Sequence, residues 1–155
     1  MPSLPVTLGF LLNDVARLLR KRFEQNARES GLTRSQWQVL AYLARNEGIQ
    51  QSALADILDV EPITLARMVD RLEAASLVER RNHPTDRRVW QLFLKPAANE
   101  LIVSMQELGD LTRAEALAGV SEADRETLTR TLTQMKANLV AACNAPQLKR
   151  TASHG

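Results

Sequence analysis

Histidine, cysteine and aromatic residues are scarce in this sequence. It holds two histidines and one cysteine, Cys143, and aromatic residues make up only 4% of the chain. A single cysteine excludes an intramolecular disulfide, and two histidines are too few for a histidine-rich metal site. We therefore expect no catalytic residue, no metal and no cofactor. Few aromatics beside abundant Leu and Ala favour a helical protein over a β-sandwich or barrel.

Long apolar runs are missing as well. The N-terminus lacks a charged start followed by an apolar stretch, so neither a signal peptide nor a membrane span is predicted. Together with the lone cysteine, this leads us to expect a cytoplasmic protein without membrane association. The length suits one ordinary domain, or a small lobe with helices that pair it with a partner.

Positive charge is concentrated in one segment of the chain. The net charge is only +2, but residues 80–95 hold five basic side chains against a single acid, Asp86. Residues 96–145 carry four basic and seven acidic side chains. A polyanion would therefore dock at the first segment.

Apolar residues recur every three or four positions through most of the chain, which predicts six helices. Gly31 is expected to end the first helix. A capping box of Thr33 and Gln36 begins the second, which we expect to run to about Asn46. Ser52 can cap a short third helix.

The fourth helix is two-faced, and Pro62 suits its first turn. At about 100° per residue one arc is an apolar stripe formed by Leu65, Met68, Val69 and Leu72. The opposite arc holds Ile63, Thr64, Arg67, Asp70 and Arg71. One face can therefore pack on the domain while the other meets a partner.

A hairpin with a basic tip is predicted next. Residues 77–81 and 89–94 are short β-forming runs, and the turn-forming residues 82–88 separate them. An arginine at such a tip can enter the minor groove of DNA while a neighbouring carboxylate orients its guanidinium, and Arg88 and Asp86 suit these roles. The alternative interpretation is an ordinary solvated loop.

Two more helices follow, one beginning at Pro96 and one capped by Ser121 with Asp124. With the first helix they present more apolar surface than a slim monomer can hide, which predicts a dimer. We expect a dimerisation helix over residues 1–32, a lobe over 33–95, dimerisation helices over 96–145 and a flexible tail over 146–155.

The succession of three helices and a basic-tipped hairpin is typical of a winged helix-turn-helix. The predicted fold class is mainly α with a small β-hairpin wing, an obligate dimer through its N- and C-terminal helices. The fourth helix would lie in a major groove, where Arg67 and Arg71 bond guanine edges or phosphates, Thr64 bonds either, and Ile63 touches a thymine methyl. The helix start at Pro62 favours a phosphate.

The segments LTRSQWQVLAYL, SALADILDVEPITLARMVDRLEAASLVERR and PTDRRVWQLFLK resemble the MarR family, closest to its SlyA-like branch. The resemblance implies a DNA-binding transcriptional regulator, a repressor that binds a palindromic operator as a two-fold dimer with half-sites about one turn apart. It assigns base recognition to residues 62–64 and Arg67, the minor groove to Arg88, and a backbone contact to Arg87. The complete predicted DNA-binding set is Ser52, Pro62, Ile63, Thr64, Arg67, Arg71, Asp86, Arg87 and Arg88.

The resemblance also implies release of DNA by a small aromatic acid or phenol. We place its pocket at Arg17, Arg20 and Trp37, where an arginine can pair with a carboxylate and the indole can stack on a ring. The alternatives are a solvated arginine face and a core tryptophan. The thiol-sensing branch of the family carries a cysteine near the start of its first helix, which is absent here, and Cys143 is expected to be a partly buried, unreactive thiol.

Two other function classes compete with this interpretation. A winged-helix adaptor would bind proteins and have little affinity for DNA. An enzyme ranks last, because the sequence shows no nucleophile with a nearby base, no paired carboxylates and no glycine-rich phosphate loop.

Overall fold

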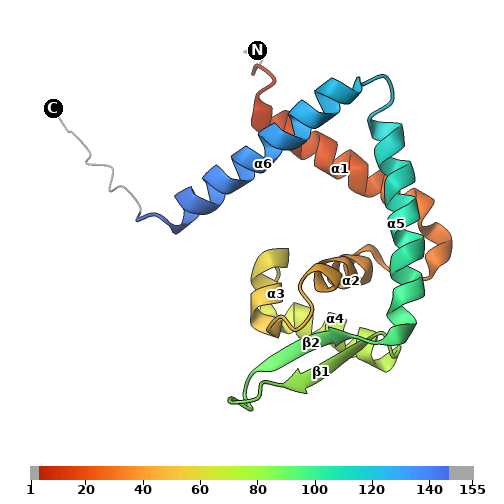
Figure 1. Cartoon of the computed structure of the whole chain (residues 1–155), viewed down its shortest axis with the longest axis vertical. Coiled ribbons are helices and arrows are strands. Elements are labelled where there is room, and N and C mark those ends of the chain that lie inside the picture. The colour runs from red at the N-terminus through yellow and green to blue at the C-terminus, as the bar shows by residue number, and fades with distance from the viewer. Residues whose placement is uncertain (1–3, 147–155) are drawn as a thin grey trace. The chain divides into compact units, whose positions relative to one another are not determined.

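The computed structural model describes residues 4–146 and divides the chain into two compact units, residues 1–116 and residues 117–155. The first unit contains, in chain order, α1 (Leu8–Asn26), the 3-10 turn η1 (Arg28–Ser30), α2 (Arg34–Arg45), α3 (Gln51–Leu58), α4 (Pro62–Ala74), β1 (Val78–Asn82), β2 (Trp90–Leu94) and α5 (Pro96–Ala116). The second contains α6 (Glu122–Asn144) (Figure 1). A mainly helical chain with one small hairpin is therefore confirmed. Of the predicted tail, residues 147–155 lie outside the described residues.

The first two helices are joined differently from the prediction. The α-helix ends at Asn26, and η1 continues the turn until Gly31 redirects the chain at a φ of 73°. The capping box at the start of α2 is confirmed, because the Gln36 amide donates to Thr33 Oγ1 at 3.2 Å and the Thr33 amide donates to Gln36 Oε1 at 3.0 Å. The end of α2 at Arg45 also agrees with the prediction.

The predicted cap of α3 is wrong. Ser52 lies inside the first turn, and the N-cap residue is Gln50, which makes no side-chain cap bond. The reason lies in the sheet, since Gln50 forms a bridge with Gln91 of β2, and the neighbouring backbone bonds to Leu92 through the Gly48 amide (2.8 Å) and the Ile49 carbonyl (3.0 Å). This extended segment sets the point at which α3 begins.

The hairpin is confirmed to within one residue at each end. Its antiparallel strands pair Val78 with Leu94 at the base and Asn82 with Trp90 near the tip. A side chain from each strand, Val78 and Leu92, is fully buried. The hairpin therefore packs against the helices through the face that carries these two residues.

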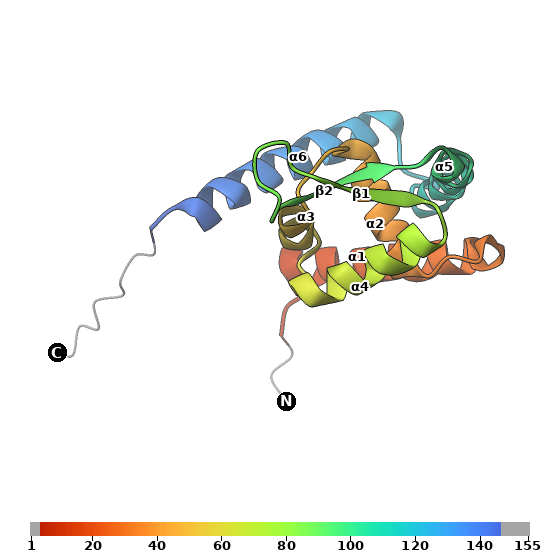
Figure 2. The same ribbon diagram turned by 90° about the horizontal axis from the view of Figure 1, so that it is seen from below.

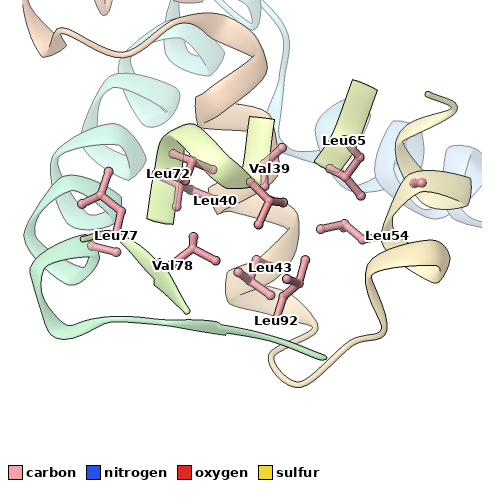
Figure 3. Packing of buried hydrophobic residues seen from close by; sticks show 12 residues of the cluster. Val39, Leu40, Leu43, Leu54, Leu65, Leu72, Leu77, Val78 and Leu92 are labelled. Carbon is pink, nitrogen blue, oxygen red and sulfur yellow. The ribbon is translucent and has the colours of Figure 1, made fainter. Parts of the chain in front are cut away.

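One apolar core holds the helices of the lobe and the hairpin together. Figure 3 shows side chains from α2, α4 and the hairpin meeting, with Leu54 of α3 at one side. Figure 2 shows the ribbons of α2, α3, α4 and the hairpin grouped together. The labelled members of the core are Val39, Leu40, Leu43, Leu54, Leu65, Leu72, Leu77, Val78 and Leu92. The predicted apolar stripe of α4 therefore faces inward.

Helix α1 is tied to α5 by polar contacts. Arg22 Nε donates to Glu115 Oε2 at 2.6 Å, and Asn26 Nδ2 donates to the hydroxyl of the buried Thr112 at 3.0 Å. In the second unit, Ser121 Oγ accepts from the Asp124 amide at 3.1 Å, which confirms the predicted cap of α6. Within residues 4–146, no helix combines the length and apolarity needed to cross a membrane.

Helix α4 ends in a Schellman motif built on a serine. Ser76 has a φ of 60°, its amide donates to the Glu73 carbonyl at 3.0 Å, and the Leu77 amide donates to the Leu72 carbonyl at 2.9 Å. A left-handed conformation costs a residue with a Cβ roughly 1–2 kcal/mol, and glycine usually occupies this position.

We expect Ser76→Gly to raise the free energy of unfolding by about 1 kcal/mol, because the left-handed penalty is removed and only part of it is offset by the greater entropy of unfolded glycine. Urea denaturation measures this change. Ser76→Ala keeps the penalty and serves as the control. Equal stability of the two variants would show that the turn is not strained.

Candidate nucleic-acid interface

The outward arc of α4 presents a mixed polar and apolar surface. Leu65, Val69 and Leu72 are fully buried, so the opposite arc is turned away from the core. Ile63 is 64% exposed although it is apolar. The other exposed members of the arc are Thr64, Arg67, Asp70 and Arg71.

The tip of the hairpin holds an arginine in a fixed direction. Both guanidinium contacts of Arg88 go to Asp86, from Nε to Oδ1 at 3.2 Å and from Nη2 to Oδ2 at 3.3 Å. The Arg88 amide also donates to Asp86 Oδ1 at 3.0 Å. The Arg88 side chain remains 90% exposed. A two-point ion pair therefore orients a cation that still faces solvent.

The loop that carries this pair is braced by its own hydrogen bonds. Asn82 Nδ2 donates to the Arg87 carbonyl at 3.0 Å, and the His83 amide donates to the Val89 carbonyl at 2.9 Å. The Val89 amide donates in turn to the Asp86 carbonyl at 3.1 Å. The arginine is thus presented by a loop of defined geometry.

Asp86 is electrostatically perturbed by its neighbour. The Arg88 guanidinium, and then the Arg88 backbone amide, hold the pKa of the Asp86 carboxyl below its ordinary value, with a smaller contribution from His83. The carboxylate is therefore ionised, and the pair intact, throughout the neutral range.

The remaining predicted DNA-contacting residues are exposed and distributed over the same lobe. Pro62 is the first residue of α4, Ser52 lies in the first turn of α3, and Arg87 precedes the paired arginine in the hairpin loop. Arg87, the charged member of the three, forms no ion pair among the described residues. Their side chains are accessible to a partner.

Arg80 departs from the expectation that the whole 80–95 segment is a docking surface. Its guanidinium is directed toward α3 and α4 and its side chain is only 13% exposed. Arg81 pairs with Glu79 at 3.1 Å and lies 4.0 Å from the centre of the Phe93 ring. The accessible positive charge is therefore concentrated at the tip.

A pocket of about 740 Å³ opens between α1, α2 and α5. Arg20 and Trp37 line it as predicted, and Trp37 stacks on Phe23 at a centroid distance of 5.9 Å. Trp37 also packs against the core, as the alternative interpretation of this residue expected. Arg17 does not line the pocket, and its guanidinium pairs instead with Asp14, one turn earlier on α1, at 3.6 Å.

Three further arginines line the pocket. Arg113 is paired with Asp110, and Arg34 lies 3.5 Å from Glu24, whereas Arg20 and Arg45 form no ion pair within residues 4–146. Sequence reasoning missed Arg34 and Arg45. Their positions, three before and eight after Trp37, place them on the same side of α2, so helical spacing could have identified them.

Comparison with known proteins agrees with this geometry. A family model described as MarR family matches residues 30–89. A solved transcriptional regulator named PA3341 is 32% identical, with a TM-score of 0.77 over 87% of this chain and 99% of its own. The chain belongs to the MarR family. Members of this family are transcriptional regulators and not enzymes.

Other MarR-family structures share the fold at lower identity. A MarR transcriptional regulator from Methanosarcina mazei Go1 is 23% identical, with a TM-score of 0.80 over 87% of this chain and 97% of its own. A mutant MarR from E. coli complexed with operator DNA is 24% identical, with a TM-score of 0.71 over 83% of this chain and 92% of its own. The winged-helix interpretation is therefore confirmed.

One prediction about sulfur chemistry needs correction. Cys143 lies in the last turn of α6 and is exposed rather than partly buried. Burial was predicted because a free cysteine commonly behaves as a small hydrophobe, but α6 contains no buried residue.

We expect the Asp86 carboxyl to titrate below the ordinary range of an aspartate, because Arg88 stabilises its charged form. Because the folded pKa is depressed, the stabilising contribution is present at neutral pH and is lost as pH falls through the depressed value. NMR titration of the carboxyl carbon measures the midpoint. Arg88→Ala should raise it, while Arg87→Ala, at a residue that does not contact the carboxylate, should leave it unchanged.

Proposed function

We propose that this MarR-family chain is a sequence-specific repressor that binds a palindromic DNA operator as a homodimer in the cytoplasm. The observation that carries the proposal is the orientation of Arg88 by Asp86 at the tip of a hairpin that shares one core with the exposed arc of α4. An oriented arginine suits the narrow minor groove, and a two-faced helix suits the major groove beside it. We also place the chain in the SlyA-like branch, on the sequence segments that resemble it.

In this proposal α4 reads bases with its outward arc. Arg67 bonds a guanine edge or a phosphate, Thr64 bonds either, and the exposed Ile63 covers a thymine methyl. Amides at the start of the helix, near Pro62, face a phosphate. Arg71 lies one turn beyond Arg67 on the same side and extends the contact.

Three further residues complete the proposed contact surface. Arg87 binds the DNA backbone next to the minor-groove arginine, and Asp86 acts by orienting Arg88. Ser52 is exposed in the first turn of α3, where its hydroxyl can bond a phosphate. The E. coli MarR mutant that shares this fold was solved with operator DNA, which supports a duplex as the partner.

Exposed apolar side chains support dimerisation. Helix α1 buries no residue, and Leu8, Leu11 and Leu18 are each more than half exposed. Helix α6 also exposes apolar side chains, with Leu139 61% exposed. Covering such surface contributes roughly 25 cal/mol per Å². We therefore assign residues 1–32 and 96–145 to the dimer, and residues 33–95 to the DNA-binding lobe, with half-sites about one helical turn apart.

The pocket between α1, α2 and α5 supports control by a small aromatic acid or phenol. It adjoins both the proposed dimer helices and the lobe, so an occupant would contact both parts. The Arg20 guanidinium is available to a carboxylate, and the aromatic rings of Phe23 and Trp37 can pack against a ligand ring. Binding that favours one arrangement of the two lobes would release the operator.

We expect Arg67→Ala and Arg88→Ala each to weaken operator binding by about 1–3 kcal/mol, because each removes a groove contact. The operator is first selected from a random duplex pool by the parent protein. Fluorescence anisotropy then measures affinity over a range of salt concentrations, and the titration should end at two chains per duplex.

Arg81→Ala, in the lobe but outside both the assigned DNA contacts and the dimer helices, is the control and should bind nearly as the parent does. Sequence-blind retention of the parent protein on every duplex would favour the protein-binding adaptor instead. Parent-like affinity of both groove variants for a selected operator would refute the assigned DNA face.

We expect Arg20→Met to weaken benzoate binding about tenfold or more and to leave phenol binding nearly unchanged, because only the carboxylate uses the charge-assisted bond. Trp37 fluorescence reports binding when Trp90→Phe removes the only other tryptophan. Arg17→Met is the matched control on the same helix. Equal losses in the two arginine variants would exclude a specific role for Arg20.

A further inference from the structure

Arg80 is the most extensively bonded arginine of the lobe, and nothing in the DNA-binding assignment uses it. It leaves β1 and spans two helices. Nε donates to Gln51 Oε1 of α3 at 2.9 Å, and Nη2 donates to the Ala66 carbonyl of α4 at 2.9 Å. Nη1 donates to Asp70 Oδ1 at 2.6 Å and to Glu73 Oε1 at 3.3 Å.

The backbone of the same residue strengthens this connection. The Arg80 amide donates to Glu73 Oε2 at 3.1 Å, so one glutamate receives both the amide and the guanidinium. The Arg80 side chain is 13% exposed, whereas that of Asp70 is 65% exposed. A planar guanidinium with its donors satisfied on several sides resists rotation far more than a single-point contact does.

This arrangement has two consequences for the proposed interface. First, Arg80 links the wing directly to α4, so the two DNA-reading parts are held at a set separation by a polar clamp in addition to the apolar core. Second, it pairs with Asp70, which lies on the outward arc between Arg67 and Arg71. An unpaired carboxylate there would repel phosphates.

We infer that Arg80 is a positioning residue for DNA recognition. It fixes the position of the wing arginine, Arg88, relative to the outward arc of α4. It also neutralises Asp70 on that arc, and it does not contact DNA itself. This inference rests on the proposed function. Through Arg80, the major-groove and minor-groove contacts become mutually dependent.

The test compares Arg80→Met with Arg81→Met, which removes the same charge from the next residue of the same strand. Arg81 is exposed and its ion pair stays within β1, so it is a matched control. On the operator selected by the parent protein, Arg80→Met should lose about tenfold or more in affinity, comparable to one groove contact. Arg81→Met should stay within about threefold. Equal losses would overturn the inference, because Arg80 would then act only as a charge.

Coupling to the wing separates positioning from a general loss of stability. In the parent background Arg88→Ala removes a well-placed contact. In the Arg80→Met background the wing no longer keeps its position relative to α4, so the contact is already weakened. The fold-loss caused by Arg88→Ala should therefore shrink when Arg80 is already replaced. Strict multiplicativity of the two losses would overturn the positioning role.

Rescue at Asp70 tests the neutralising role. The double variant Arg80→Met with Asp70→Asn removes the exposed acid together with its partner, so it should recover part of the lost affinity. No recovery would overturn this role. If Arg80→Met does not fold, judged by circular dichroism, Arg80→Lys replaces it. Lysine keeps the charge but loses the planar fork, so coupling to Arg88 should still weaken.

One further measurement needs no DNA. Hydrogen exchange on the free protein should show faster exchange of the β1 amides in Arg80→Met than in Arg81→Met, since the clamp restrains that strand. If the parent protein selects no duplex but this difference is present, the proposed function fails while the clamp stands. If the parent binds its operator and the difference is absent, the clamp fails while the function stands.

Discussion

The structure depends on one shared apolar core, in which α4 and the hairpin that follows it bury their inner residues together. Leu65 and Leu72 of α4 meet Val78 and Leu92 of the hairpin, all fully buried. Because interiors are close-packed, neither element can shift without opening a cavity or forcing a clash. The outward arc of α4 and the tip of the hairpin thus acquire a defined relative position from residues that never reach the surface.

Polar contacts further restrict the relative positions of α4 and the hairpin, which the core already limits. The turn after Ser76 carries the chain directly from α4 into β1, and the Arg80 clamp spans the same two elements from the other side. At the far end of the hairpin, Asp86 restricts the remaining freedom of Arg88. Each step removes conformational entropy before a partner arrives, which is the physical basis for a preorganised binding surface.

The proposed ligand pocket lies where the lobe meets helices α1 and α5. Stacking of Phe23 on Trp37 joins α1 to α2, and the nearby Met105 of α5 is almost completely buried. The pocket beside these residues therefore borders the elements proposed for dimerisation and those proposed for DNA binding. An occupant there can change the relation between these two sets of elements without touching the side chains proposed to contact DNA.

Local chemistry made much of this protein predictable. The capping box at Thr33, the proline at the start of α4, the two-faced pattern of that helix and the turn residues of the hairpin all act within a few positions, and each was confirmed. Errors arose where a distant element intervened. Ser52 failed as a cap because β2 draws Gln50 into an extended conformation. Arg17 is a different case, since its guanidinium pairs with Asp14 of the same helix and does not line the pocket that Arg20 lines.

By itself the sequence determined the order of the elements, the inward face of α4 and the presence of an acid two residues before the wing arginine, since periodicity, capping and spacing are properties of neighbours in the chain. Tertiary structure alone decided which arginines are available. Arg80 and Arg88 look equivalent in a charge count, yet one is enclosed by α3 and α4 and the other stands in solvent. Folding brings Asp70 and Glu73 into contact with Arg80, and no local sequence pattern predicts these contacts.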